Sequence, residues 1–169
     1  TSVLTQAFTG GKICLLDGQG NGMLYLDDTF PLDKAVEIIT SGVTRFNGET
    51  CTSINGVLVK ETVYESLKES LVESFGKLRV GHPLERGIQI GPLFSEKQVL
   101  GLLKITQESQ EAKILYGGEH RGAYFSPTIV EGVHLKDPMV REGFFGPLVW
   151  IHPIRQEKLW DWFRENQFP

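Results

Sequence analysis

A cysteine in a small polar segment is the side chain of this sequence best suited to chemistry. Cys51 lies within residues 46–53, FNGETCTS, which follow an apolar helical pattern. A thiol among Gly, Thr and Ser just beyond a helix end can be reached by a ligand, and nearby backbone N–H groups would favour its thiolate form. The commoner fate of a cysteine is to be a buried, inert apolar residue. Local composition therefore leaves Cys51 open between a nucleophile and a core residue.

Other polar features of the chain have structural interpretations. Residues 18–22, GQGNG, lack the G-x-G-x-x-G spacing of a phosphate-binding loop and precede a strand-like run, so they predict a turn between strands. Asp27 and Asp28 come just before a helix with proline in its first turn, which favours capping and solvation over paired catalytic carboxylates. His82 stands beside a proline in a loop, and we expect a loop histidine there.

The overall composition is that of one globular domain. The 169 residues are 40% hydrophobic with a formal net charge of −4, and the basic residues are scattered, so we expect neither nucleic acid nor a membrane as a partner. No apolar run approaches the roughly 20 residues of a membrane-spanning helix, and the first residues lack the basic region of a signal peptide, which predicts a cytoplasmic protein. Cys14, Cys51 and four separated histidines predict free thiols and no metal site.

Hydrophobic periodicity predicts an α/β fold, an open sheet flanked by helices, that would hold Cys51 on a rigid support. Strands are expected at residues 12–17, 23–26, 113–116 and 148–151, and an extended piece at residues 123–130. Helices are expected at residues 32–46, 61–77 and 95–107, and near the C-terminal end with Leu159, Trp160, Trp162 and Phe163 as the apolar side. Ser95 and Gln98 fit a capping box, and Pro127 favours a sheet edge or a strand start.

Several short motifs resemble, in their order and spacing, those of the NAD(P)-dependent aldehyde dehydrogenase superfamily. Residues 48–51, GETC, are similar to its nucleophile loop, whose pattern is close to G-Q-x-C. In the family this loop precedes a strand that ends in valine, which implies a strand at residues 56–59 here. Further similar segments follow at residues 24–28, 32–36, 80–84, 90–93, 126–130 and 145–148. The resemblance implies that residues 21–169 form the catalytic domain of this family, truncated at both ends, and that residues 1–20 are a remnant of its cofactor-binding domain.

This resemblance implies an oxidoreductase that acts on a small aldehyde with NAD or NADP as acceptor. The Cys51 thiolate would attack the aldehyde carbon to give a thiohemiacetal, and hydride transfer to the nicotinamide would leave a thioester. The backbone N–H of Cys51 would be one donor to the developing oxyanion. A full-length member would be a homo-oligomer, whereas this chain alone is expected to be inactive.

The first departure from the family pattern concerns the base that activates water. The family's hydrolytic glutamate aligns with Leu16, whose neighbour Asp17 would point to the opposite face of a strand. Glu49 stands where the family usually has glutamine, two residues from Cys51, and is therefore a candidate replacement base. A solvated loop carboxylate is the alternative for Glu49.

The second departure concerns the E-x-F-G-P motif, whose glutamate holds the nicotinamide ribose in the family. Gly143 takes that position here, while Glu142 precedes it and Phe145 matches the phenylalanine of the motif. Phe145 and Glu142 are thus the candidate cofactor-binding residues implied by the resemblance.

Three functions stay open at this point. The chain is part of an aldehyde-oxidising dehydrogenase, a catalytically degenerate relative that keeps only the fold, or a relative that releases the thioester to coenzyme A or another thiol. The last would not require the missing base. Retention of Cys51 in its loop favours the two enzymatic alternatives over the degenerate one.

Overall fold

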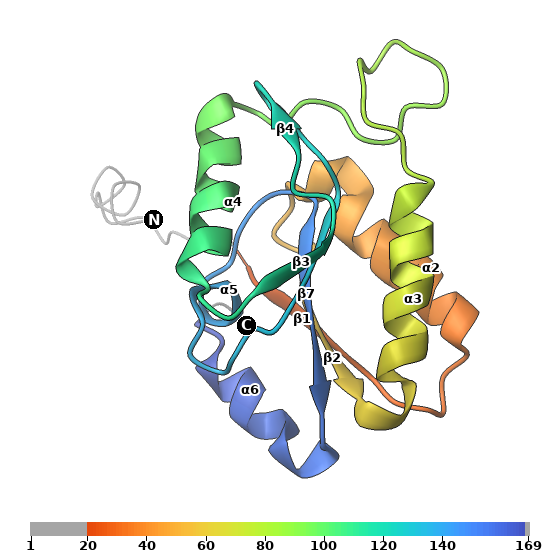
Figure 1. Ribbon diagram of the computed structural model, residues 1–169, viewed down its shortest axis with the longest axis vertical. Coiled ribbons are helices and arrows are strands. Elements are labelled where there is room, and N and C mark those ends of the chain that lie inside the picture. Colours follow the sequence, from red (N-terminus) through yellow and green to blue (C-terminus); the bar gives the residue numbers. More distant parts are fainter. Residues whose placement is uncertain (1–19, 168–169) are drawn as a thin grey trace, which may run out of the picture.

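The computed structural model describes residues 20–167 and has an α/β architecture of three layers (Figure 1). A five-stranded sheet with the order β1-β2-β7-β6-β3 forms the central layer. Its strands are β1 (Gly22–Leu26), β2 (Ile54–Lys60), β3 (Lys113–Tyr116), β6 (Thr128–Glu131) and β7 (Leu148–Ile154). All neighbouring pairs are parallel except β3 with β6. The expected open sheet flanked by helices is confirmed.

Helices cover both faces of this sheet. α2 (Leu32–Thr44) and α3 (Tyr64–Gly76) lie on one face, and α4 (Glu96–Glu108), α5 (Pro138–Arg141) and α6 (Leu159–Glu165) lie on the other (Figure 1). A small hairpin of β4 (His120–Arg121) and β5 (Tyr124–Phe125) stands near the start of α4. Short 3₁₀ turns occupy Glu61–Val63 and Gln156–Lys158, and Arg45–Gly48 forms a turn that is not helical at Phe46 and Asn47.

The core divides into two clusters because side chains alternate across the central strands. In β2, Leu58 packs with the α4, α5 and α6 layer, whereas its neighbours Val57 and Val59 pack with α2 and α3. Trp150 of β7 is fully buried in the first cluster. A Cβ atom at Gly56 would lie 2.0 Å from the Trp150 ring, so the absence of a side chain at Gly56 lets that ring lie flat against β2.

Of the two alternatives for Pro127, the strand start is confirmed, because Pro127 directly precedes the first residue of β6, which lies between β7 and β3. Two other expectations about these elements need correction. β7 runs three residues past the expected end, through Pro153 to Ile154. In α6, Trp162 is buried whereas Trp160 is 66% exposed, so Trp160 does not belong to the apolar side of the helix.

The capping role predicted for Asp27 and Asp28 is wrong for α2, because no side chain caps the start of this helix; the two carboxylates make polar surface contacts instead. Asp27 Oδ1 accepts hydrogen bonds from Thr29 Oγ1 at 2.6 Å and Thr29 N at 2.9 Å, and these bonds hold the Asp27 pKa below its ordinary value. Asp28 forms an ion pair with Lys60 at 2.7 Å, which lowers the Asp28 pKa. The expected strand at residues 12–17, Cys14 and the first two residues of the glycine-rich segment 18–22 lie outside the described residues.

Candidate active site

The loop that carries Cys51 begins with a sharp turn at the end of α2. Phe46, Asn47 and Gly48 follow one another with φ angles of +52°, +57° and +69°. Non-glycine residues rarely adopt this left-handed conformation, and a bulky one such as Phe46 does so at a cost. The turn stops the helix and directs the chain toward β2. Cys51 emerges from it as an exposed free thiol, so the alternative of a buried core cysteine is wrong.

Gly48 is in close contact with the segment that precedes β7. The backbone N–H of Gly146 donates to the Gly48 carbonyl at 3.0 Å. A Cβ atom on Gly48 would lie 2.2 Å from the Gly146 carbonyl oxygen, which is far inside van der Waals contact. Only glycine fits here, both for its φ angle and for this approach. The two motif segments that the resemblance singled out, residues 48–51 and 145–148, are therefore adjacent in space.

Two side chains of the same turn hold a third segment, residues 91–94. Asn47 Oδ1 accepts from Gly91 N at 2.9 Å, and Asn47 Nδ2 donates to the Pro92 carbonyl at 3.1 Å. Glu49 Oε1 accepts from Phe94 N at 3.0 Å. The Glu49 carboxylate, predicted as a base or a solvated group, thus has one oxygen engaged with the backbone.

The start of α4 connects segment 91–94 to Phe145. Ser95 Oγ caps the helix by accepting from Gln98 N at 3.3 Å, as predicted. The second half of the predicted capping box is wrong, because Gln98 Nε2 donates to the Phe145 carbonyl at 3.0 Å. Gln98 is thereby tied to the segment before β7, and its side chain does not turn back to its own helix start.

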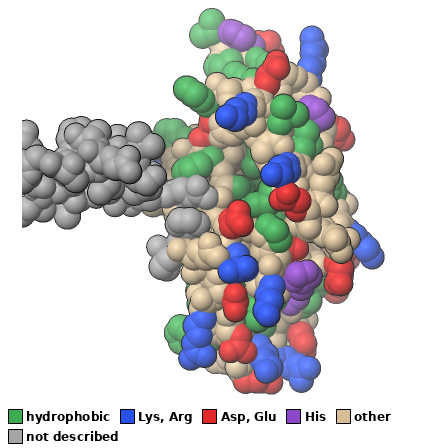
Figure 2. Space-filling view, turned by 90° about the vertical axis from the view of Figure 1, so that its left-hand side faces the viewer, with side chains coloured by type: hydrophobic (Ala, Val, Ile, Leu, Met, Phe, Trp, Pro, Cys, Tyr) green, Lys and Arg blue, Asp and Glu red, His purple; other side chains and the backbone are tan. Residues whose placement is uncertain are grey.

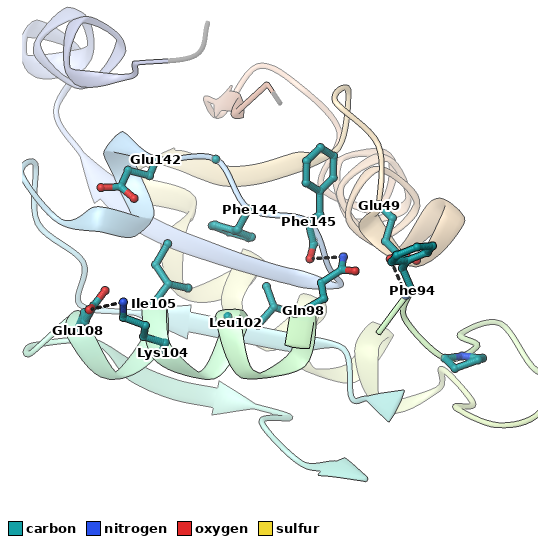
Figure 3. A pocket seen from close by; sticks show the side chains of 13 residues that line it. Glu49, Phe94, Gln98, Leu102, Lys104, Ile105, Glu108, Glu142, Phe144 and Phe145 are labelled. Atoms are coloured by element: carbon teal, nitrogen blue, oxygen red, sulfur yellow. Dashed lines mark hydrogen bonds and ion pairs between the residues drawn. The ribbon is translucent and has the colours of Figure 1, made fainter. Parts of the chain in front are cut away.

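A groove between α4 and the segment before β7 brings together three of the four predicted site residues. Glu49, Glu142 and Phe145 all line this cavity of about 830 Å³. Figure 3 shows Glu49 beside Phe94 at one end, Glu142 toward the other, and Phe145 with Gln98 between them. Its walls also carry Leu102, Ile105, Phe144, Lys104 and Glu108. Cys51 is absent from the lining of this groove.

A second, smaller hollow lies on the other flank of the loop. Thr50 and Thr52, the two neighbours of Cys51, line a cavity of about 410 Å³ together with Arg45. Ser41 and Glu37 of α2 also contribute to its wall. The loop therefore presents Glu49 to one hollow and Thr50 and Thr52 to another, with the exposed Cys51 between these threonines in the chain.

Arg45 is the cationic group of the smaller hollow. Its guanidinium carbon lies 5.2 Å from the centroid of the Phe46 ring, and within residues 20–167 it has no ion-pair partner. Glu37, the acidic residue of the same wall, is paired with Lys34 at 3.0 Å. An incoming anion would thus meet a cation that no carboxylate of the described part neutralises.

Sequence reasoning did not single out Arg45, Asn47 or Gln98 for the site. The signals in the sequence are weak: an Asn-Gly pair such as Asn47-Gly48 is common in turns, and Gln98 satisfies a helix-capping pattern equally well. The expected loop role of His82 is confirmed, since its Nδ1 accepts from Leu84 N at 3.3 Å.

Charge is mixed over the molecular surface around this region. On the face in Figure 2, basic and acidic side chains are interspersed, and hydrophobic side chains gather in its upper half. Between residues 20 and 167, no three His, Cys, Asp or Glu side chains gather in a way that could hold a metal ion. None of the helices in that range is long and apolar enough to cross a bilayer.

The fold matches those of solved aldehyde dehydrogenases. The structure superimposes on aldehyde dehydrogenase 21 from Physcomitrella patens, solved in complex with the reaction product succinate, with a TM-score of 0.87 and 26% identity. That match covers 98% of this chain and 35% of the other. The class of protein that the fold defines is therefore the catalytic α/β unit of an aldehyde dehydrogenase.

The chain belongs to the aldehyde dehydrogenase family, whose model matches residues 1–159. It is 35% identical over 141 residues to glutarate-semialdehyde dehydrogenase of Pseudomonas putida, a match that covers 82% of this chain and 29% of that protein. It is 34% identical over 143 residues to the NADP(+) succinate-semialdehyde dehydrogenase of Escherichia coli, covering 82% of this chain and 30% of the relative. The chain thus spans about a third of the length of these relatives.

Proposed function

We propose that the protein containing this chain oxidises an aldehyde with NAD or NADP as acceptor, and that Cys51 is its nucleophile. The observation that carries the proposal is the exposed Cys51 thiol on a turn flanked by two hollows. Membership of the aldehyde dehydrogenase family supports the reaction class. A cytoplasmic location and a homo-oligomeric state of the complete protein belong to the same proposal.

The chemistry assigned to this chain is covalent catalysis by sulfur. The Cys51 thiolate forms a bond to the aldehyde carbon, and the carbonyl π electrons move to oxygen, where the Cys51 backbone N–H is one proposed donor. After oxidation of that carbon, water adds to the thioester and the carbon–sulfur bond breaks to release the acid and the thiolate. Glu49 is the proposed acceptor of the water proton, through the carboxylate oxygen that Phe94 N does not engage.

The larger groove fits the nicotinamide end of a dinucleotide. The Phe144 ring lies with Leu102 and Ile105 in an apolar wall that suits a flat heterocycle, whereas the Phe145 ring points away from Leu102 and Ile105 (Figure 3). The exposed Glu142 carboxylate can accept hydrogen bonds from ribose hydroxyls. Glu142 lines the same groove as Phe145, so the displacement of the family glutamate by one position does not remove a carboxylate from this wall. When bound, the cofactor would accept the hydride.

The smaller hollow supports an aldehyde that carries a carboxylate at its other end. The two relatives are named for glutarate semialdehyde and succinate semialdehyde, and the solved relative was crystallised with succinate. Arg45 supplies a cation, and Ser41, Thr50 and Thr52 supply hydroxyl groups in the same wall. A planar guanidinium is the side chain that pairs best with a carboxylate.

The first experiment compares the complete protein with its Cys51→Ser and Cys51→Ala variants. Each is assayed for reduced nicotinamide formation with succinate semialdehyde, with NAD or NADP, and with and without coenzyme A. We expect activity in the wild type and a loss of at least about a thousandfold in both variants, because the thiolate is both nucleophile and leaving group. Acyl-coenzyme A as the main product would favour the thiol-acceptor alternative. If the wild type shows no activity and iodoacetamide does not alkylate Cys51, the catalytically degenerate relative would be the remaining alternative.

The second experiment tests the carboxylate-bearing substrate through Arg45→Gln. We expect KM for succinate semialdehyde to rise about ten- to a hundredfold, because a hydrogen bond to a charged group contributes roughly 1.5–3 kcal/mol. KM for butyraldehyde, which has the same carbon number without the carboxylate, should stay within about twofold. Arg155→Gln, an exposed arginine paired with Glu61, serves as the matched control. An equal rise in KM for both aldehydes would contradict the proposal that the substrate is an aldehyde with a carboxylate at its other end.

A further inference from the structure

A closed ring of hydrogen bonds passes through three segments that are far apart in the sequence. It runs from Asn47 to residues 91 and 92, and along α4 to Gln98. From there it continues through the Phe145 carbonyl to Gly146, whose N–H returns to Gly48. The Glu49 bond to Phe94 N is a second connection across the same ring. The loop that bears Cys51 is thus linked at two places to the walls of the larger groove.

The turn at the start of the Cys51 loop is strained, so it needs contacts that hold its conformation. Phe46 and Asn47 are consecutive non-glycine residues at positive φ, and such conformations persist only where the surroundings hold them. Phe46 is 67% exposed, so packing of its side chain contributes little to holding the turn. The side-chain amide of Asn47 is the group of this turn that both donates to and accepts from segment 91–94.

Position 47 requires a positive φ angle and a side chain that both donates to and accepts from segment 91–94, and asparagine is the residue type that meets both requirements. It tolerates the left-handed conformation better than other non-glycine residues, and its amide has one donor and one acceptor end. The acceptor end receives Gly91 N and the donor end reaches the Pro92 carbonyl. Glycine would accept the φ angle without either bond, and alanine would provide neither the bonds nor the conformational tolerance.

We infer that Asn47 is a positioning residue of the reaction, whose side-chain amide fixes the Cys51 loop against the groove formed by α4 and Phe145. This role rests on the proposed function, because Asn47 would set the distance between the proposed nucleophile Cys51 and the molecule bound in the larger groove. Asn47 need not touch substrate or cofactor. It acts through Gly91 and Pro92, which fix the entry to α4, and through the ring that returns to Gly48.

The test compares Asn47→Gly and Asn47→Ala with the wild type in the complete protein. Both variants lose the amide, but glycine adopts a positive φ angle without strain, so we expect Asn47→Gly to keep the fold. We expect kcat to fall about tenfold or more in both, since a displacement of about 1 Å at a reacting centre can cost a hundredfold, while KM for the aldehyde changes less than about threefold. Leu67→Ala, at a fully buried position in α3 that takes no part in the ring, controls for mere destabilisation.

Hydrogen exchange gives a readout that does not depend on activity. We expect amide exchange in Asn47→Gly to rise at residues 91–94 and also across the ring at residues 145–147 and 49–53. In Leu67→Ala, amide exchange in these segments should rise no more than exchange in the rest of the protein. A rise confined to residues 91–94, or an unchanged kcat in Asn47→Gly, would overturn the inference. Failure of the proposed function can be told apart from failure of this inference. An active Cys51→Ser variant would show that Cys51 is not the nucleophile, whatever the Asn47 variants do.

Discussion

The Gly146 N–H donates to the Gly48 carbonyl at 3.0 Å, and the Cα of Gly48 lies so close to Gly146 that no side chain fits between them. This contact joins the turn after α2 to the segment before β7. It places the exposed Cys51 loop next to the groove wall that carries Phe144 and Phe145. The candidate site therefore depends on a backbone approach that tolerates no Cβ.

Gly48→Ala should destabilise the protein by about 2–4 kcal/mol, because it combines a left-handed φ angle with a clash against the Gly146 carbonyl. The measurement is urea unfolding followed by tryptophan fluorescence. Gly101→Ala is the matched control, since a Cβ at this α4 position meets nothing within 4 Å. Alanine there should stabilise the protein by roughly 0.5–1 kcal/mol through helix propensity. Similar unfolding midpoints for both variants would contradict the close contact at Gly48.

Asp137→Ala should cost about 2–3 kcal/mol of unfolding free energy. Asp137 is fully buried, caps α5 by accepting from Met139 N at 2.9 Å, and accepts from Ser109 Oγ at 2.5 Å. Its removal leaves both donors without that acceptor in a buried place. Asp33→Ala, an exposed position in the first turn of α2, should change stability by less than about 0.5 kcal/mol. Equal losses in the two variants would argue against a buried cap.

Trp162→Ala should be far more destabilising than Trp160→Ala, although the two residues are nearly adjacent. Trp162 is 6% exposed, and its ring centroid lies 5.7 Å from that of Trp150 and 4.2 Å from that of His152. Its truncation is expected to cost about 3–5 kcal/mol, against less than about 1 kcal/mol for the exposed Trp160. Thermal or denaturant unfolding of the two variants decides this. A larger loss for Trp160 would mean that α6 presents its other face to the sheet.

Protonation of His152 should lower the free energy of unfolding as the pH falls below about 6.5, the ordinary pKa of histidine. Burial lowers the His152 pKa, and a hydrogen bond with the backbone of Val133 opposes this only in part. The unfolded chain therefore binds a proton at a higher pH than the folded one, so the unfolding free energy decreases as the pH falls from the unfolded pKa toward the folded pKa.

The matching measurement is the unfolding free energy between pH 7.5 and pH 5.5 for His152→Gln and His134→Gln. His134 is exposed and serves as the control. We expect a shallower pH dependence in His152→Gln and a wild-type slope in His134→Gln. Identical slopes for His152→Gln and the wild type would show that burial of His152 does not affect its titration.

Much of the architecture could be predicted from the sequence because its determinants are local. Apolar residues at helical spacing predicted α2 through Ala35, Ile39 and Val43, all of which are buried. The strand after the Cys51 loop was predicted from the family resemblance, and it is buried on both faces as β2. Cys51 stood out because a thiol among small polar residues after a helix is unusual, and its exposure agrees with that interpretation.

The sequence by itself thus determined the helices, most of the strands and the segment that carries Cys51, since hydrophobic period and turn residues act over a few positions. Only the tertiary structure decided which long-range contacts form. Gln98 could equally cap its own helix, yet it bonds to Phe145, and Trp160 had the same apolar character as Trp162 but faces solvent. Such choices depend on how α4 and α6 pack on the sheet, because packing sets the distance and direction between groups that are remote in sequence.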